Sequence, residues 1–184
     1  TVTNGNIISG TLTNSGITFT GGNNNINAIL AGTGGLTNVA GSTTLSAANL
    51  YSGGTVINSG QITATVDNAL GASGNTLTVN SNSTLTLTGT AQTNGVVALN
   101  GSTLTGGTLS GSSFTTRGNN SIGTALAGAG GLTNVAGSTT LSAANLYTGG
   151  TVLNGGQVTA TVNNALGANG TSLTVNSNST LTLT

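Results

Sequence analysis

The chain has 184 residues, of which only 35% are hydrophobic and 2% aromatic, so a thin apolar core is expected rather than a compact multilayer domain. It contains one acidic residue, Asp67, one basic residue, Arg117, and no histidine or cysteine. This composition excludes the basic surface that nucleic-acid binding needs, and it excludes disulfide bonds and thiolate chemistry. No run approaches the roughly 20 apolar residues of a membrane-spanning helix, so no membrane contact is expected within this segment.

Thirty-two glycines, abundant threonine, serine and asparagine, and no proline favour extended strands joined by turns. Strand-like segments alternate apolar and polar residues, which places the apolar side chains on one side of each strand. In chain order these segments are Thr11–Thr13, Ile17–Thr20, Thr55–Ile57, Gln61–Val66, Thr76–Val79 and Ser83–Thr88. Clusters rich in glycine and asparagine separate them and predict turns.

A stretch of 52 residues occurs twice. The segment 37–88 returns as 133–184 with eight substitutions, at an offset of 96 residues. The substitutions keep apolar positions apolar and turn positions small or polar. The flanks keep the offset more loosely, with Asn4-Gly5 matching Asn100-Gly101 and Gly10-Thr11-Leu12 matching Gly107-Thr108-Leu109. We therefore expect two tandem units, residues 1–96 and a truncated 97–184, in one continuous solenoid that is an excerpt or processed subunit of a longer array.

Within one unit the strand and turn pattern predicts five rungs, which start near Gly34, Gly53, Asn75, Val96 and Phe114. Short strands with short loops at this spacing are typical of a β-solenoid, whereas a β-sandwich would not repeat itself with its interior side chains preserved. The predicted fold is all-β, a right-handed parallel β-helix of nine or ten rungs. The residues expected inside are Leu45, Val56, Ile62, Val66, Leu70, Leu77, Val79, Leu85 and Leu87.

Three asparagines, Asn58, Asn68 and Asn80, occupy predicted turns. Two interpretations stay open for them. Their side chains could point inward and stack in ladders from rung to rung, as in cross-β structures. Alternatively, asparagine is present only because it tolerates the backbone angles of a turn.

The segment 34–62 closely resembles the autotransporter passenger-associated strand repeat of bacterial surface proteins. The resemblance rests on Gly34-Gly35-Leu36-Thr37, Gly41, Leu45-Ser46, Ala48-Asn49, Tyr51, Gly53-Gly54-Thr55, Asn58 and Gly60, on the same positions of the second copy from Gly130 to Gly156, and on Asn68-Ala69-Leu70-Gly71. It covers about a third of the chain and implies a β-helix that is secreted or exposed on a bacterial cell surface. The family's repeat occurs in adhesins, self-associating proteins and enzyme-bearing passengers, so the resemblance implies no single activity.

Catalysis is not expected in this chain, and we identify no catalytic, cofactor-binding or metal-binding residue. Glycan-cleaving solenoids need paired carboxylates or a metal cluster, which one Asp and one Arg do not supply. Asp67 is replaced by Asn163 in the second copy, so it is interpreted as a surface or turn residue. Tyr51 and Tyr147 are expected to cover a corner of the solenoid rather than to form a sugar-stacking platform.

Two functions remain. The preferred hypothesis is a structural segment of a bacterial cell-surface or extracellular fibre, with the chain itself as partner through end-to-end continuation or head-to-tail assembly, because both ends are strand-like and uncharged. The alternative is an adhesin that binds a surface glycan or a neighbouring cell, or an ice-binding solenoid. Thr-x-Thr triplets such as Thr84/Thr86 and Thr103/Thr105 point to ice binding, but their irregular spacing predicts that they do not align on one face.

Overall fold

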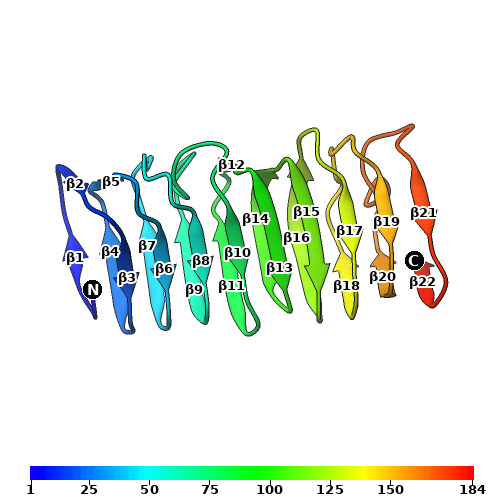
Figure 1. The fold of residues 1–184 in the computed structure, drawn as a ribbon, viewed down its shortest axis with the longest axis horizontal. Helices are drawn as coiled ribbons and strands as arrows, with labels where there is room; N and C mark the ends of the chain where they lie inside the picture. The colour runs from blue at the N-terminus through cyan, green and yellow to red at the C-terminus, as the bar shows by residue number, and fades with distance from the viewer.

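The computed structural model describes all 184 residues and contains 22 strands and no helix. The strands lie side by side along the long axis of an elongated molecule, and the two termini lie at opposite ends (Figure 1). Every strand pairing is parallel, and each strand pairs with strands one turn before and after it in the chain. The protein is therefore a β-solenoid, as the sequence predicts.

Two long sheets and an irregular third side enclose the core. The first sheet has nine strands, which are β3 (Ile17–Phe19), β6 (Leu36–Asn38), β8 (Thr55–Ile57), β10 (Leu77–Val79), β13 (Val96–Asn100), β15 (Ser113–Arg117), β17 (Leu132–Asn134), β19 (Thr151–Leu153) and β21 (Leu173–Val175). The second has eleven, which are β1 (Asn6–Ile7), β4 (Asn23–Ile26), β7 (Ser42–Leu45), β9 (Gly60–Ala64), β11 (Ser83–Leu87), β12 (Ala91–Thr93), β14 (Thr103–Ser110), β16 (Asn120–Ala127), β18 (Ser138–Leu141), β20 (Gly156–Ala160) and β22 (Ser179–Leu183). On the third side β2 (Thr11–Thr13) pairs with β5 (Ile29–Ala31), and β12 pairs with the second half of β14.

The registers show how unequal rungs stack. Leu36 pairs with Thr55, and Thr55 pairs with Leu77, so the first rung is 19 residues long and the next is 22. The five strands of the first sheet from β6 to β15 begin within two residues of the predicted rung starts. Turns and third-side segments of different length absorb the variation, because the paired strand positions stay in register.

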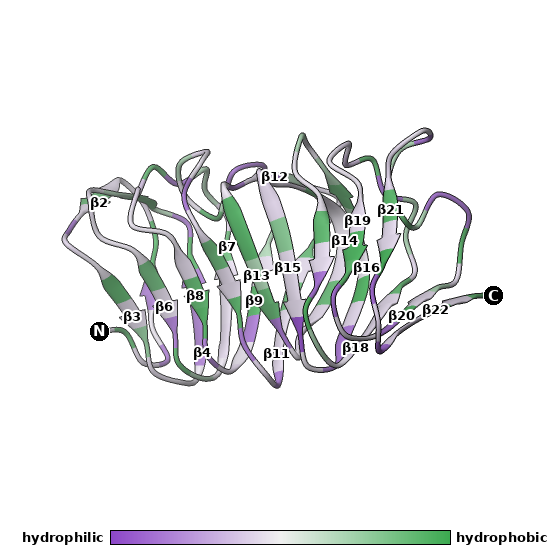
Figure 2. Cartoon of the chain, turned by 45° about the vertical axis from the view of Figure 1, so that its right-hand side comes forward, coloured by the Kyte–Doolittle hydropathy of each residue, from purple (hydrophilic) through white to green (hydrophobic).

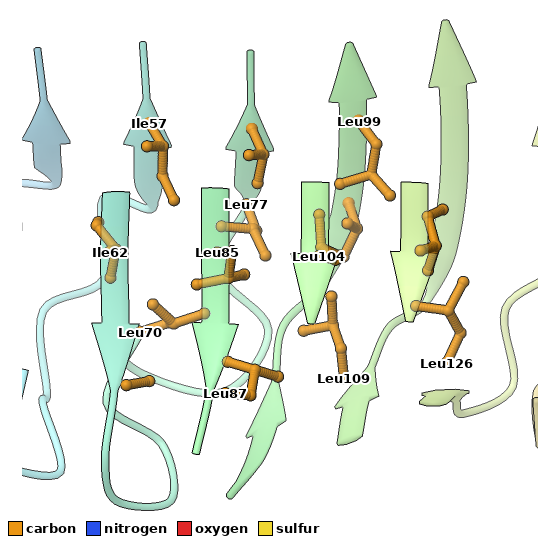
Figure 3. Packing of buried hydrophobic residues seen from close by; sticks show 14 of the residues in the cluster. Ile57, Ile62, Leu70, Leu77, Leu85, Leu87, Leu99, Leu104, Leu109 and Leu126 are labelled. Carbon is orange, nitrogen blue, oxygen red and sulfur yellow. The ribbon is translucent and has the colours of Figure 1, made fainter. Parts of the chain in front are cut away.

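Thirty buried residues form one continuous apolar cluster along the axis. In the middle of the molecule, side chains from both sheets and from the third side point into the space between them (Figure 3). Seven of the nine residues predicted to lie inside are buried: Leu45, Ile62, Leu70, Leu77, Val79, Leu85 and Leu87. Figure 2 shows the same alternation as hydrophobic patches that recur on successive strands.

The prediction for Val56 is wrong. Thr55 and Ile57 are fully buried and Val56 lies on the outer side of β8. Thr55 points inward because its Oγ1 is within 2.6 Å of the Tyr51 hydroxyl and donates to the Leu70 carbonyl at 3.1 Å. Val66 is only partly buried and packs against the edge of the core.

Buried amide side chains replace backbone pairing on the third side. Asn49 accepts a hydrogen bond from the Leu30 N–H of the preceding rung at 2.8 Å and donates to the Ala69 carbonyl of the following rung at 2.7 Å. Asn145 makes the equivalent pair in the second repeat, with Leu126 and Ala165. A buried backbone group without a partner is costly, so these amides hold together the side that has the least strand structure.

Glycine is required where turns of adjacent rungs touch. Gly60 has φ +77°, and a Cβ there would lie 2.1 Å from the Gly41 carbonyl oxygen. Gly156 and Gly137 repeat this contact at 2.0 Å. Only glycine combines a positive φ with so close an approach of two backbones, and the glycine pair is therefore kept in both repeats.

Candidate functional site

The two charged residues are separate and exposed. Asp67 lies in the turn after β9, where its Oδ1 accepts a hydrogen bond from the Ala91 N–H at 2.8 Å. Arg117 is the last residue of β15. Asp67 thus anchors the start of β12, which is the turn role that the sequence suggests. No group of three histidine, cysteine, aspartate or glutamate side chains is placed to hold a metal ion.

The two tyrosines lie in the loops before β8 and β19, with their rings buried inside the solenoid. Tyr51 and Tyr147 are 2% and 0% exposed, so neither ring can stack on a sugar. Each hydroxyl is 2.6 Å from the Oγ1 of an inward threonine, Thr55 or Thr151. Burial raises the pKa of both, that of Tyr147 to about 12, although the threonine contact opposes the shift. The ring of Tyr147 also packs against Phe114, with centroids 6.1 Å apart.

An asparagine ladder is present, but it lies on the surface. The Asn80 amide donates to Asn58 Oδ1 at 2.9 Å, and the Asn100 amide donates to Asn80 Oδ1 at 3.0 Å. Of the two interpretations left open, the inward one is wrong for these residues, because Asn58 is exposed and Asn80 is half-buried. Asn68 is outside the ladder and has φ +54°, which agrees with the turn interpretation for that residue.

Hydroxyl side chains form two columns on the outer side of the second sheet. Strand register places six in one column, which are Thr84, Thr103, Ser121, Thr140, Thr159 and Thr182. Four occupy the adjacent column, which are Thr44, Thr63, Thr86 and Thr105. The prediction that irregular spacing prevents alignment is wrong for these residues, because the variable turns lie outside the paired strands. The columns have repeats of about 4.8 Å between rungs and about 6.6 Å between columns.

The C-terminal face of the solenoid is apolar and open. Residues 173–184 have the same sequence as residues 77–88. Leu173, Val175 and Leu183 are 47%, 46% and 69% exposed, whereas their counterparts in the first repeat, Leu77, Val79 and Leu87, are at most 1% exposed. The next rung makes the difference, since in the first repeat β13 and β14 cover these positions.

A hollow of about 390 Å³ opens beside this face and is lined by residues 160, 162–173, 183 and 184. In the first repeat the segment 89–95, which contains β12, occupies the corresponding place. There Gln92 accepts from the Leu70 N–H at 3.1 Å and donates to the Val66 carbonyl at 2.8 Å, while the Asn68 N–H donates to the Ala91 carbonyl.

Comparison with known proteins gives no relative: no family model, no curated protein and no solved structure matches this chain. The structure has no helix with the length and hydrophobicity needed to span a membrane.

Proposed function

We propose that this chain is a structural repeat segment of a bacterial cell-surface or extracellular fibre. The main supporting observation is that the strands pair in parallel, rung upon rung, around one continuous apolar cluster along a single axis. A solenoid of this kind extends along one axis by adding rungs. Only one acidic and one basic side chain are present in 184 residues, so charge repulsion does not oppose the stacking of many rungs in a stalk or filament.

The packing also favours a mechanical role. The chain makes 108 backbone hydrogen bonds, and the strand pairings run along the solenoid axis from rung to rung. Buried amides such as Asn49 and Asn145 add further links on the third side. Hydrogen bonds between rungs resist a pulling force along the axis, so the buried polar groups help to hold adjacent rungs together.

Immunogold electron microscopy of the native material tests this proposal. Antibodies against the 184-residue chain should label extracellular filaments or surface projections, and added protease should remove the label from intact cells. Label confined to the cell interior would overturn the proposed role.

The two hydroxyl columns favour one second candidate, an ice-binding or glycan-binding face. Regular hydroxyls at the strand spacing offer ordered water or a glycan a repeating set of hydrogen-bond partners. Ice-recrystallisation inhibition by the purified chain, lost on Thr86→Tyr and Thr103→Tyr, would support it. Inhibition that is absent, or unchanged by these substitutions, would dismiss the ice-binding candidate, and a glycan array would test the glycan-binding one.

A further inference from the structure

The two repeats differ most in one exposed turn on the third side. Three of their eight substitutions fall within four positions, where Ser-Gly-Asn-Thr at 73–76 becomes Asn-Gly-Thr-Ser at 169–172. The second copy therefore has an Asn-Gly pair that the first copy lacks. Asparagine is a thermolabile residue, and a following glycine leaves the next backbone nitrogen sterically open to the asparagine side chain.

The turn leaves both members of this pair free. Asn169 and Gly170 are the central residues of a β-turn, which the Thr171 N–H closes by donating to the Ala168 carbonyl at 3.2 Å. Gly170 has φ +83°, a value that favours glycine at this turn position. Both central residues are exposed, and the Gly170 N–H donates to no group of the chain. The Asn169 side chain can thus approach the Gly170 nitrogen without displacing a neighbouring rung.

The same turn is open in the interior of the solenoid, where the following rung is in place. Ser73 and Gly74 are exposed, and the Asn75 N–H closes the turn on the Ala72 carbonyl at 3.3 Å. The Gly74 N–H again donates to no group of the chain. A Cβ added at Gly74 or Gly170 would meet no atom within 4 Å. The openness of this turn is therefore a property of the repeat.

In three of the other four Asn-Gly pairs, the glycine N–H already has an acceptor. These bonds are Gly5 to Asn24 Oδ1 at 3.1 Å, Gly95 to the Asn75 carbonyl at 2.6 Å, and Gly101 to Asn120 Oδ1 at 3.0 Å. In the fourth pair, Asn154 Oδ1 accepts from Asn176 Nδ2 at 2.7 Å, and the Gly155 carbonyl accepts from Asn134 Nδ2 at 2.6 Å. All four pairs must break contacts between rungs before the side chain reaches the glycine nitrogen.

We propose that Asn169 is a modification site, at which the folded chain deamidates spontaneously. The Gly170 nitrogen attacks Cγ of Asn169, the Cγ–Nδ2 bond breaks, and ammonia leaves with the proton of the Gly170 N–H. Water then opens the resulting five-membered imide at either carbonyl and gives aspartate or isoaspartate. The product is ionised at neutral pH, so a second negative charge appears in a chain that has one acidic side chain. This chemistry is independent of the proposed fibre role.

Peptide mapping by mass spectrometry tests the site. The folded chain is incubated in mildly alkaline buffer, and a nonspecific protease supplies the peptides. Asn169 should deamidate at least about ten times faster than Asn94 and Asn100, which react only after local opening. In urea this preference should disappear, because every glycine nitrogen is then free. Equal rates in the folded chain, or a preference for Asn169 that persists in urea, would overturn the proposal.

Two variants of the first repeat separate the turn from the Asn-Gly sequence. Ser73→Asn puts an Asn-Gly pair into the open interior turn and should create a second site that reacts at a rate similar to that of Asn169. Ser59→Gly creates a pair at Asn58, whose Oδ1 accepts from Asn80 Nδ2 at 2.9 Å, so this pair should react slowly. If the two variants react equally fast, or if Ser73→Asn does not react, the structure of the turn does not select the site.

An Asn169→Ser variant restores the residue of the first copy and should remove the modification at this turn without changing the circular dichroism spectrum. Deamidation should likewise leave the spectrum of the native chain unchanged, since the turn lies outside the paired strands. A loss of strand signal that precedes the reaction at Asn169 would show that unfolding exposes the site, and it would refute reaction of the folded turn.

Discussion

The third-side amide of Asn49 allows a quantitative test of how this thin core is held together. Asn49 is 1% exposed, and its side chain satisfies the Leu30 N–H and the Ala69 carbonyl at 2.8 and 2.7 Å. Asn49→Ala leaves two buried backbone groups without partners, each worth about 1–3 kcal/mol. We expect the free energy of unfolding to fall by roughly 2–4 kcal/mol, because some relaxation or water entry offsets the loss. Urea unfolding followed by far-ultraviolet circular dichroism measures the change.

The repeat supplies its own replicate and control. Asn145→Ala should cost a similar amount, since it breaks the same two kinds of bond, and the two losses should add because the sites are five rungs, or about 24 Å, apart. Asn58→Ala removes one bond of the exposed ladder and should cost less than about 1 kcal/mol. If Asn49→Ala is no more destabilising than Asn58→Ala, the third side does not depend on its buried amides, and the argument fails.

Three further outcomes follow from the same structure. Leu85→Asp puts an unpaired carboxylate at a fully buried position and should lower the free energy of unfolding by several kcal/mol. Thr86→Asp, on the outer side of β11, should change it by about 0.5 kcal/mol or less. Thermal unfolding of the two variants checks this, and equal losses would contradict the assigned faces. Burial keeps Tyr51 and Tyr147 protonated in the folded chain above the ordinary tyrosine pKa of about 10. The free energy of unfolding should therefore be constant below about pH 9 and fall between about pH 10 and 12, where only the unfolded chain loses these protons. Urea unfolding at several pH values measures this fall, and a fall that persists after Tyr51→Phe and Tyr147→Phe would refute its cause. Because the chain has only one acidic and one basic side chain, its melting temperature should change little between low salt and about 1 M sodium chloride. A large drop measured by calorimetry would show that ionic contacts stabilise the fold.

The sequence by itself determined the class of fold and the spacing of the rungs. Alternation within short segments fixed the strands, and the 96-residue repeat showed that one set of interior residues is used twice. Positions with a single apolar residue between polar neighbours, such as Leu85 and Leu45, were assigned to the correct side. These features are local, since a side chain on a strand alternates whatever lies on the next rung.

Only the tertiary structure decided which polar residues lie inside and which hydroxyls align. In Thr-Val-Ile of β8 the local pattern allows either face, and the contacts of Thr55 with Tyr51 and Leu70 select the inward threonine. Asn49 is inward for the same reason, because its partners lie one rung before and one rung after it in the chain. The hydroxyl columns depend on pairings between residues 18 to 23 positions apart, with turns that vary in length. Neighbours in this fold are separated by a whole rung, so a pattern read along the chain does not contain them.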